Sequence, residues 1–284
     1  MHETYFMIAG ILLKVISPFP FYSANGENFR CAPAEPDYIF RFEQVKDIPK
    51  LMEGAKPVED VFWAHEYQRE DGTFLRAFLW KEQYYTEISM IGKREGICYF
   101  LSTEILMNRA KEGFELLMYL CLEQILVQFG ALVLHSSHIV VNGKGLVFSA
   151  PTQTGKSTQA ELWRKYAGAS VINGDRSVLR KIEGQWYACG CPMCGTSGIH
   201  LQSLEPLGNI VMLSQSKENI VRKLPAKEAF HLLYPQITIS QWNAAYMDQA
   251  LALINDLLMD VPVWHYSCTK DPEAVTVLRD AIGI

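Results

Sequence analysis

A glycine-lysine-serine sequence between a predicted strand and a predicted helix constrains this chain more than any other feature. Residues 150–158 read Ala-Pro-Thr-Gln-Thr-Gly-Lys-Ser-Thr. An apolar run at 146–148 precedes them, and a helical pattern at 159–167 follows and ends at Gly168. In this setting a glycine lets the backbone turn so that successive N–H groups point at phosphate oxygens. The sequence therefore predicts a strand, a phosphate-binding loop and a helix in direct succession.

The residues of this loop have expected tasks at a bound nucleotide. Gly155 allows the turn, Lys156 reaches the β- and γ-phosphates, and the Ser157 hydroxyl ligates Mg²⁺. The helix that begins at about Lys156 directs the positive end of its dipole at the same anion. Ala150 stands where the usual pattern has its first glycine. We therefore expect ATP and Mg²⁺ as cofactors, with nucleotide contacts from Thr152, Gln153, Thr154, Gly155, Lys156, Ser157 and Thr158.

Composition and charge exclude several classes of function. The 284 residues carry a formal net charge of −5, which leaves no basic footprint for nucleic acid. Apolar residues make up 49% of the chain, as in soluble globular proteins, and no apolar run is long enough to span a bilayer. The apolar residues 7–13 are interpreted as part of a strand and not as a signal peptide. The seven cysteines are odd in number and scattered, which together with ATP chemistry indicates reduced thiols and a cytoplasmic protein.

The chain is expected to contain two domains. Residues 1–110 are rich in β-branched and aromatic residues separated by turn residues, which favours strands at 7–16, 38–42, 74–80, 84–90 and 96–100. We assign residues 1–110 to a smaller β-rich N-terminal domain that binds a partner. We assign residues 111–284 to a nucleotide-binding catalytic domain, which opens with a buried helix at 111–129.

Hairpins and short strands are expected to define the second domain. Asn142-Gly143 is a strong hairpin signal, since both positions tolerate positive φ. The strand before the loop is then the second arm of a hairpin. A strand at 170–172 ends in the turn Asn173-Gly174-Asp175-Arg176, and a second hairpin is expected at Glu183-Gly184. The remaining elements are a strand at 209–213, helices at 226–234 and 243–259, a strand at 263–268 and a final helix capped by Asp271.

The order of these motifs resembles a known family. His135 at a strand end, a hairpin, the Gly-Lys-Ser-Thr loop and a strand ending in an acidic turn follow one another. This order resembles the catalytic domain shared by HPr kinase/phosphorylase and ATP-dependent phosphoenolpyruvate carboxykinase. The resemblance covers about residues 130–284 and is greatest to small HPr-kinase-like proteins associated with peptide-natural-product pathways. It implies an α/β fold with a mixed-sheet P-loop core, and transfer of the ATP γ-phosphate to a serine hydroxyl of a peptide or small protein.

The resemblance also assigns a role to Asp175. The family usually has two adjacent acidic residues in the turn after the loop helix, one for catalysis and one for the metal. Here the pair reads Gly174-Asp175, so one acid remains. Asp175 is therefore expected to hold the metal, to act as the base, or both. It lies 19 residues after Lys156, a distance that a helix and a returning strand bridge. The alternative is that Asp175 only caps the turn.

His135 is the second candidate for the chemistry. A neutral imidazole near the γ-phosphate would accept the serine proton, and a charged one would stabilise the phosphate. The alternative is a hydrogen-bonded histidine at a strand end without a catalytic role. Candidates for a positive group at the transition state are Arg176, Arg180, Arg222 and Lys223, of which Arg222 is preferred.

The cysteine cluster at residues 189–194 has three interpretations. Cys189, Cys191 and Cys194, with His200 nearby, have spacings at which thiolates bind zinc. The segment lacks a second pair of cysteines, so a redox pair and plain loop or buried thiols are the alternatives. Its glycine and proline content favours a loop that faces the substrate.

Together these residues predict an ATP- and Mg²⁺-dependent serine kinase that acts on a peptide or small protein. The catalytic residues would be Asp175, His135 and Lys156, and the metal ligands Ser157 and Asp175. Ala150 and Gly174 favour an alternative, a nucleotide-binding regulatory or assembly module with weak catalysis. A small-molecule kinase is the second alternative. We expect no nucleic-acid or membrane partner, and a homo-oligomer is compatible with the sequence.

Overall fold

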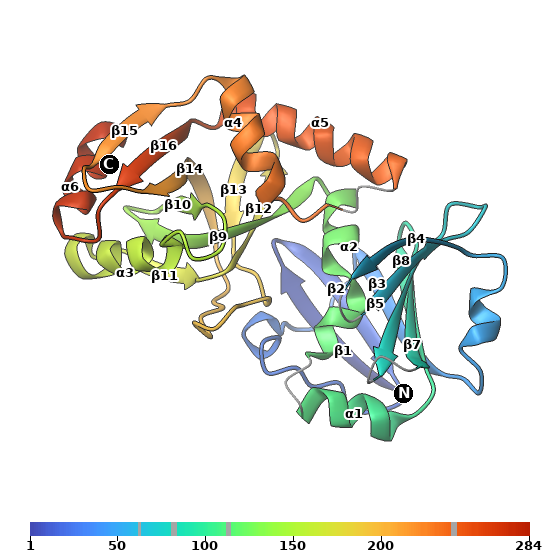
Figure 1. Cartoon of the computed structure of the whole chain (residues 1–284). Coiled ribbons are helices and arrows are strands. Elements are labelled where there is room, and N and C mark those ends of the chain that lie inside the picture. Colours follow the sequence, from blue (N-terminus) through green and yellow to red (C-terminus); the bar gives the residue numbers. More distant parts are fainter. Residues whose placement is uncertain (62–63, 81–83, 112–114, 240–242) are drawn as a thin grey trace. The chain divides into compact units, whose positions relative to one another are not determined.

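The computed structural model describes residues 1–284 except 62–63, 81–83, 112–114 and 240–242 (Figure 1). The fold is α/β with mixed sheets, as predicted, and it divides into two compact units, Met1–Gln128 and Phe129–Ile284. In the described part of the chain, no helix has both the length and the apolar character needed to cross a bilayer.

The first unit contains an eight-stranded sheet in the order β1-β2-β3-β8-β7-β6-β5-β4. The strands are β1 (His2–Ile8), β2 (Ile11–Ser17), β3 (Tyr38–Gln44), β4 (Lys56–Val61), β5 (Ala64–Gln68), β6 (Phe74–Trp80), β7 (Tyr84–Ile91) and β8 (Glu95–Phe100). Strand β3 is parallel to both of its neighbours, β2 and β8, and the other neighbours are antiparallel. The single strand predicted at 7–16 is wrong: Ala9 and Gly10 take positive φ values of 53° and 73° and form a hairpin turn.

Short helices complete this unit: η1 (Glu27–Phe29), η2 (Pro49–Met52), α1 (Thr103–Lys111), η3 (Leu116–Leu120) and α2 (Leu122–Gln128). The continuous helix predicted at 111–129 is wrong, although residues 112–114 lie outside the described part. Cys121 takes a left-handed conformation with φ 49° and separates a 3-10 turn from α2. The division between the units falls after Gln128, beyond the expected boundary at 110, because η3 packs on β7 and β8.

The second unit is built on eight strands. They are β9 (Ala131–Val141), β10 (Lys144–Ser149), β11 (Ser170–Asn173), β12 (Arg176–Ile182), β13 (Gln185–Cys189), β14 (Leu204–Gln215), β15 (Ile220–Lys223) and β16 (Val263–Cys268). The predicted hairpins are confirmed: β9 and β10 join at Asn142-Gly143, and β12 and β13 join at Glu183-Gly184, with positive φ at all four turn residues.

Strand β10 pairs antiparallel with β9 and parallel with β14. Because β9 also pairs with β12, and β13 joins β12 to β14, these five strands form a closed circuit of hydrogen-bonded neighbours. The strands approach closely inside it: a Cβ built at Gly145 of β10 would lie 2.6 Å from the Ala188 Cβ of β13 and 3.4 Å from His138 Nε2 of β9. Gly145 is therefore required for the closure.

The helices of this unit are α3 (Lys156–Ala167), α4 (Ala226–Leu233), η4 (Tyr234–Gln236), α5 (Ala244–Asp260) and α6 (Glu273–Ile282). Helix α3 begins and ends where the sequence predicts, at Lys156 and before Gly168, which has φ 66°. One apolar core includes residues of β10, α3, β16 and α6, such as Phe148, Trp163, Tyr266 and Leu278. The core fixes α3 at the end of β10 (Figure 1).

His138 predicts a pH-dependent stability. It is fully buried, burial lowers its pKa to about 3, and its ring nitrogens have no hydrogen-bond partner among the described residues. Below pH 6.5 the unfolded chain binds a proton at this position and the folded chain does not, so the stability falls as the pH decreases from 6.5 towards 3. The difference in free energy of unfolding between His138→Leu and the wild type should therefore shift by about 1.4 kcal/mol in favour of the variant when the pH is lowered from 8 to 5.5.

Urea denaturation of both proteins at the two pH values measures this shift. A difference between His138→Leu and the wild type that stays constant from pH 8 to pH 5.5 would contradict the account.

Candidate functional site

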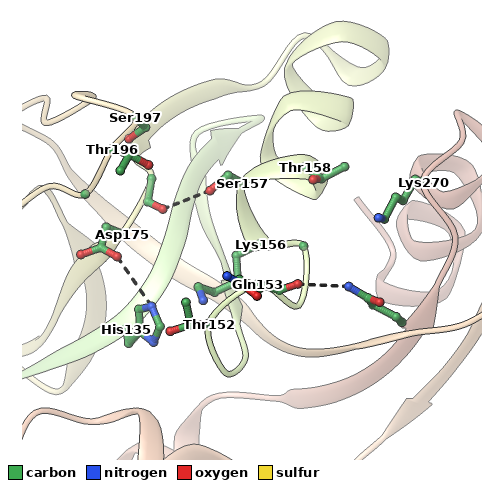
Figure 2. Close-up of a pocket in the computed structure, with 14 residues that line it drawn as sticks. His135, Thr152, Gln153, Lys156, Ser157, Thr158, Asp175, Thr196, Ser197 and Lys270 are labelled. Carbon is green, nitrogen blue, oxygen red and sulfur yellow. Dashed lines mark hydrogen bonds and ion pairs between the residues drawn. The ribbon is translucent and has the colours of Figure 1, made fainter.

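The second unit contains a cavity of about 350 Å³ where β10 ends and α3 begins (Figure 2). Its walls come from segments far apart in the sequence. They are His135 of β9, residues of the loop and of the α3 N-terminus, the turn after β11, the segment before β14, and the ends of β14 and β16. The lining residues are His135, Thr152, Gln153, Gly155, Lys156, Ser157, Thr158, Gly174, Asp175, Gly195, Thr196, Ser197, Gln215 and Lys270.

The loop between β10 and α3 curls around the Lys156 side chain. Gln153 and Gly155 take positive φ values of 64° and 116°, which turn the loop back towards the helix. The Lys156 Nζ donates to the carbonyl oxygens of Ala150 at 3.0 Å and Pro151 at 3.3 Å. Burial lowers the pKa of this ammonium group. The loop therefore surrounds a cation even without a ligand.

The predicted nucleotide contacts lie on the cavity, with one exception. Thr154 is not among the lining residues, and its N–H donates to the Pro151 carbonyl oxygen at 3.4 Å. This bond lies inside the loop and stabilises its turn. The sequence pattern cannot tell a loop residue that faces the ligand from one that supports the turn.

Ser157 and Asp175 approach each other through the turn after β11. The Ser157 hydroxyl donates to the Gly174 carbonyl oxygen at 3.4 Å, and Asp175 is the next residue. This contact connects the first turn of α3 to the acidic turn. Oxygen ligands of this kind suit Mg²⁺, which keeps several waters and takes few protein ligands.

Asn173 organises this turn and was not predicted as a site residue. Its side-chain oxygen accepts from the N–H groups of Asp175 at 2.8 Å and Arg176 at 2.9 Å. Its amide nitrogen donates to the carbonyl oxygens of Cys191 at 2.8 Å and Met193 at 2.9 Å. Asparagine side chains often accept from the backbone N–H two residues on, so the contact within the turn follows from the local sequence, whereas the contacts to Cys191 and Met193 do not.

His135 lies beside Asp175 on the cavity wall (Figure 2). Strands β9 and β12 pair His135 with Arg176 in register. The His135 Nε2 lies 3.6 Å from Asp175 Oδ1, and the Nδ1 lies 3.3 Å from Gln236 Oε1. Burial, followed by the positive charges of Lys156 and Arg176, lowers the pKa of His135. Gln236 was missed because the sequence has no local signal for a contact across 101 positions.

The segment at residues 190–203 forms one wall of the cavity. It is attached to β11 by the Asn173 amide and by the Leu201 N–H, which donates to the Ile172 carbonyl oxygen at 2.9 Å. A Cβ built at Gly174 would lie 2.9 Å from the Ser197 Cβ and closer still to its hydroxyl. An acidic side chain at residue 174, where the family resemblance implies a second acid, would therefore collide with Ser197.

Cys189, Cys191 and Cys194 are not among the described residues that line the cavity. Cys189 and Cys191 are fully buried, and burial raises the pKa of each thiol to about 12. Both are thus protonated at neutral pH. Across the residues that the structure describes, no group of three or more His, Cys, Asp or Glu side chains is arranged to hold a metal ion.

The cation on the far side of the cavity is Lys270, which the sequence analysis missed. Arg176, Arg180, Arg222 and Lys223 are not among the described residues that line the cavity, and the preferred Arg222 pairs with Glu228 at 2.7 Å. Lys270 follows β16, which runs parallel to β14, itself parallel to β10. Carboxyl ends of adjacent parallel strands meet at one edge of a sheet, and this topology brings Lys270 to the loop.

Hydrogen bonds hold the Lys270 end of the cavity in place. The Gln215 amide donates to the Gln153 carbonyl oxygen at 3.1 Å. The backbone N–H of Thr269 donates to Asn219 Oδ1 at 2.9 Å, and Gln159 of α3 donates to the Thr269 carbonyl oxygen at 2.9 Å. In Figure 2, Lys270 lies on the opposite side of Lys156 from His135 and Asp175.

Comparison with known proteins gives little further information. No protein-family model matches this chain, and no curated protein matches it. The solved structure of the Hpr(Ser) kinase/phosphatase from Coxiella burnetii overlaps 52% of this chain and 95% of its own chain, at 11% identity and a TM-score of 0.32. An overlap this weak is a distant similarity and carries no conclusion about function.

The packing of Gly174 against Ser197 is testable by a double-mutant cycle. Gly174→Ala should destabilise the protein by about 1 kcal/mol, the low end of overpacking costs, because the added methyl group meets the Ser197 side chain of an exposed segment. Ser197→Gly removes that side chain, so the double variant should recover most of the loss. Urea denaturation of the four proteins gives the coupling energy, and Gly208→Ala, where a Cβ would meet ordinary contacts of 3.5 Å or more, is the control. Strictly additive losses would show that the two residues do not collide.

Proposed function

We propose that this chain is an ATP- and Mg²⁺-dependent phosphotransferase that transfers the γ-phosphate to a serine hydroxyl of a peptide or small protein. One observation carries the proposal: a cationic loop, a hydroxyl, a carboxylate and a histidine line the same cavity. These are Lys156, Ser157, Asp175 and His135. Phosphoryl transfer requires little more than positioning, a metal and neutralisation of charge, and this set contains a group for each.

The loop would hold the phosphates. Backbone N–H groups of a loop that leads into a helix N-terminus bind phosphate oxygens. Lys156 donates to two loop carbonyl oxygens, and a phosphate would compete for the same protons. The contacts would come from residues 152–158, with Thr154 supporting the turn.

Mg²⁺ would be held by the Ser157 hydroxyl and the Asp175 carboxylate. The residues fit this ion, because both line the cavity and meet at Gly174, and because Mg²⁺ prefers oxygen ligands. When bound, the ion would neutralise charge on the phosphate oxygens. Asp175 also adjoins His135, so the reacting phosphate would lie at this end of the cavity.

The nucleotide would then have a defined direction. Its γ-phosphate would face His135 and Asp175, and its sugar and base would extend towards Gln215 and Lys270. This direction is supported by the two ends of the cavity, which lie on opposite sides of Lys156 (Figure 2). It is also supported by the hydrogen bonds that fix the Thr269–Lys270 backbone.

The rest of the assignment follows the family resemblance. The chain would have a mixed-sheet P-loop core of the HPr kinase/carboxykinase type in the second unit, residues 129–284, and the smaller β-rich unit at 1–128 would bind the partner. The protein would be cytoplasmic. A peptide or small protein with a serine is the proposed acceptor.

One observation favours a second candidate, a nucleotide-binding regulatory module without catalysis. The family resemblance implies two adjacent acids, and here Ser197 fills the space beside Gly174. Only Asp175 then remains to serve both the metal and the proton. In a regulatory module, nucleotide binding would persist and phosphate transfer would be absent.

A transfer assay with two variants separates the candidates. The wild type, given γ-labelled ATP, Mg²⁺ and a library of serine-containing peptides, should label a peptide. Asp175→Asn should bind ATP normally without metal but lose transfer at least 10²-fold, because the metal ligand and the neighbour of His135 are both lost. Lys156→Ala should weaken ATP binding itself, as measured by calorimetry.

The possible outcomes distinguish the phosphotransferase from the regulatory module. Normal ATP binding by the wild type with no transfer to any peptide or small-molecule acceptor supports the regulatory module. Equal ATP affinity of Lys156→Ala and the wild type removes nucleotide binding from this cavity and overturns both candidates.

The proposed direction of the nucleotide gives a separate prediction. Lys270→Ala should weaken ATP binding by about fivefold, which corresponds to about 1 kcal/mol, and should leave the affinity for inorganic tripolyphosphate unchanged. The reason is that Lys270 would contact only the sugar or the base. Lys165→Ala, an exposed lysine on α3 outside the lining, is the matched control. Equal weakening of both ligands would place Lys270 at the terminal phosphates and reverse the direction.

A further inference from the structure

His135 has two neighbouring acceptors for a single proton. A neutral imidazole carries one N–H, on either Nδ1 or Nε2. The side-chain oxygen of Gln236 lies 3.3 Å from Nδ1, and a carboxylate oxygen of Asp175 lies 3.6 Å from Nε2. The first distance permits a hydrogen bond, and the second is too long for one. The geometry favours a proton on Nδ1.

Gln236 is held firmly against β9. It ends η4, and the following residue, Ile237, forms an antiparallel bridge with Leu134, the neighbour of His135. The Thr238 N–H donates to the Val133 carbonyl oxygen at 2.9 Å. The Tyr246 hydroxyl of α5 donates to the Thr238 carbonyl oxygen at 3.3 Å. The backbone on both sides of the histidine contact is therefore fixed by contacts that do not involve the cavity.

We propose that Gln236 is a positioning residue that keeps the His135 proton on Nδ1 and leaves the Nε2 lone pair facing the cavity. The inference rests on the proposed function and assigns the proton acceptor within it. The acceptor hydroxyl oxygen attacks the γ-phosphorus, and its new O–P bond forms. The bond from the γ-phosphorus to the β,γ-bridging oxygen breaks, ADP leaves with that electron pair, and the hydroxyl proton goes to Nε2 of His135.

The position of the proton matters because Asp175 competes for it. A carboxylate accepts hydrogen bonds more strongly than an amide oxygen. In the protein without nucleotide and metal, loss of the Gln236 oxygen would leave the Asp175 carboxylate, 3.6 Å from Nε2, as a neighbouring acceptor, and the proton would move to Nε2. That nitrogen would then be unable to accept a proton from a substrate. Gln236 thus selects the tautomer that suits a base.

Substitutions at 236 separate this role from packing. Gln236→Leu keeps the size but removes the acceptor. Gln236→Asn keeps the amide, but the side chain is one methylene too short to reach Nδ1. Gln236→Glu keeps an acceptor oxygen at the same reach. Thr238→Ala changes the exposed side chain of the same segment and leaves its backbone hydrogen bonds, so it is the matched control.

NMR of ¹⁵N-histidine in the nucleotide-free protein tests the assignment directly. At pH 8 an imidazole with its ordinary pKa is neutral, so the nitrogen shifts of His135 identify its protonated nitrogen; a His135→Gln sample assigns the signal. We expect a protonated Nδ1 in the wild type, Gln236→Glu and Thr238→Ala. We expect a protonated Nε2 in Gln236→Leu and Gln236→Asn. A protonated Nε2 in the wild type, or a protonated Nδ1 that persists in the Leu and Asn variants, overturns the proposal.

Kinetic measurements then test whether the position of the His135 proton affects phosphate transfer. Gln236→Leu and Gln236→Asn should lower kcat by 10-fold or more with an unchanged KM for ATP, since a positioned base contributes about 10²–10⁴-fold. Gln236→Glu should keep most of the activity. An unchanged kcat in the Leu variant would overturn the positioning role. Failure of the wild type to transfer phosphate would overturn the proposed function, whereas the NMR result still decides where the proton lies.

Discussion

The two neighbours of β10 are the constraint on which the second unit depends. Strand β10 pairs antiparallel with β9 on one side and parallel with β14 on the other. The antiparallel neighbour carries His135 to the loop, and the parallel neighbour carries Gln215 to the same edge. Strand β16, parallel to β14, adds Lys270 one step further along. A cavity with chemically different ends follows directly from this mixture of strand directions.

The Asn173 side chain joins the acidic turn to the segment that forms the opposite wall of the cavity. Its side-chain oxygen shapes the acidic turn, and its amide nitrogen holds the segment that forms the opposite wall. Because the residue is fully buried, each of these bonds is shielded from water and is costly to lose. The acidic turn and residues 191–193 are therefore held together by one side chain.

Local chemistry made much of the second unit predictable. The turn at Asn142-Gly143, the end of α3 at Gly168 and the strand at 263–268 each depend on residues that are adjacent in sequence. The prediction at 7–16 was wrong because Ala9 enters a positive-φ turn that alanine rarely adopts, inside an apolar run. The predicted helix at 111–129 breaks in the same way, because the buried Cys121 also takes a positive φ.

The site, too, was predictable only where its residues lie close together in the sequence. The loop and Asp175 lie in one stretch of sequence, and the expectation for Asp175 rested on the family resemblance as well as on its spacing from Lys156. Lys270 reaches the cavity and Gln236 reaches His135 only through the tertiary fold, which a single sequence does not contain. Ser197 is near the cavity because residue 174 has no side chain, a relation that appears only when both residues are placed.

The closed circuit of β9, β12, β13, β14 and β10 has a consequence for how the unit opens. Each of these strands has hydrogen-bonded neighbours on both sides, so none can separate without breaking two ladders. Amide hydrogens of β10 should therefore exchange only with global unfolding. The segment at 190–203 is anchored to β11 through residues 191, 193 and 201, but its residues 195–197 are exposed. This part of the cavity wall can therefore move more readily than β10 when the cavity exchanges its contents.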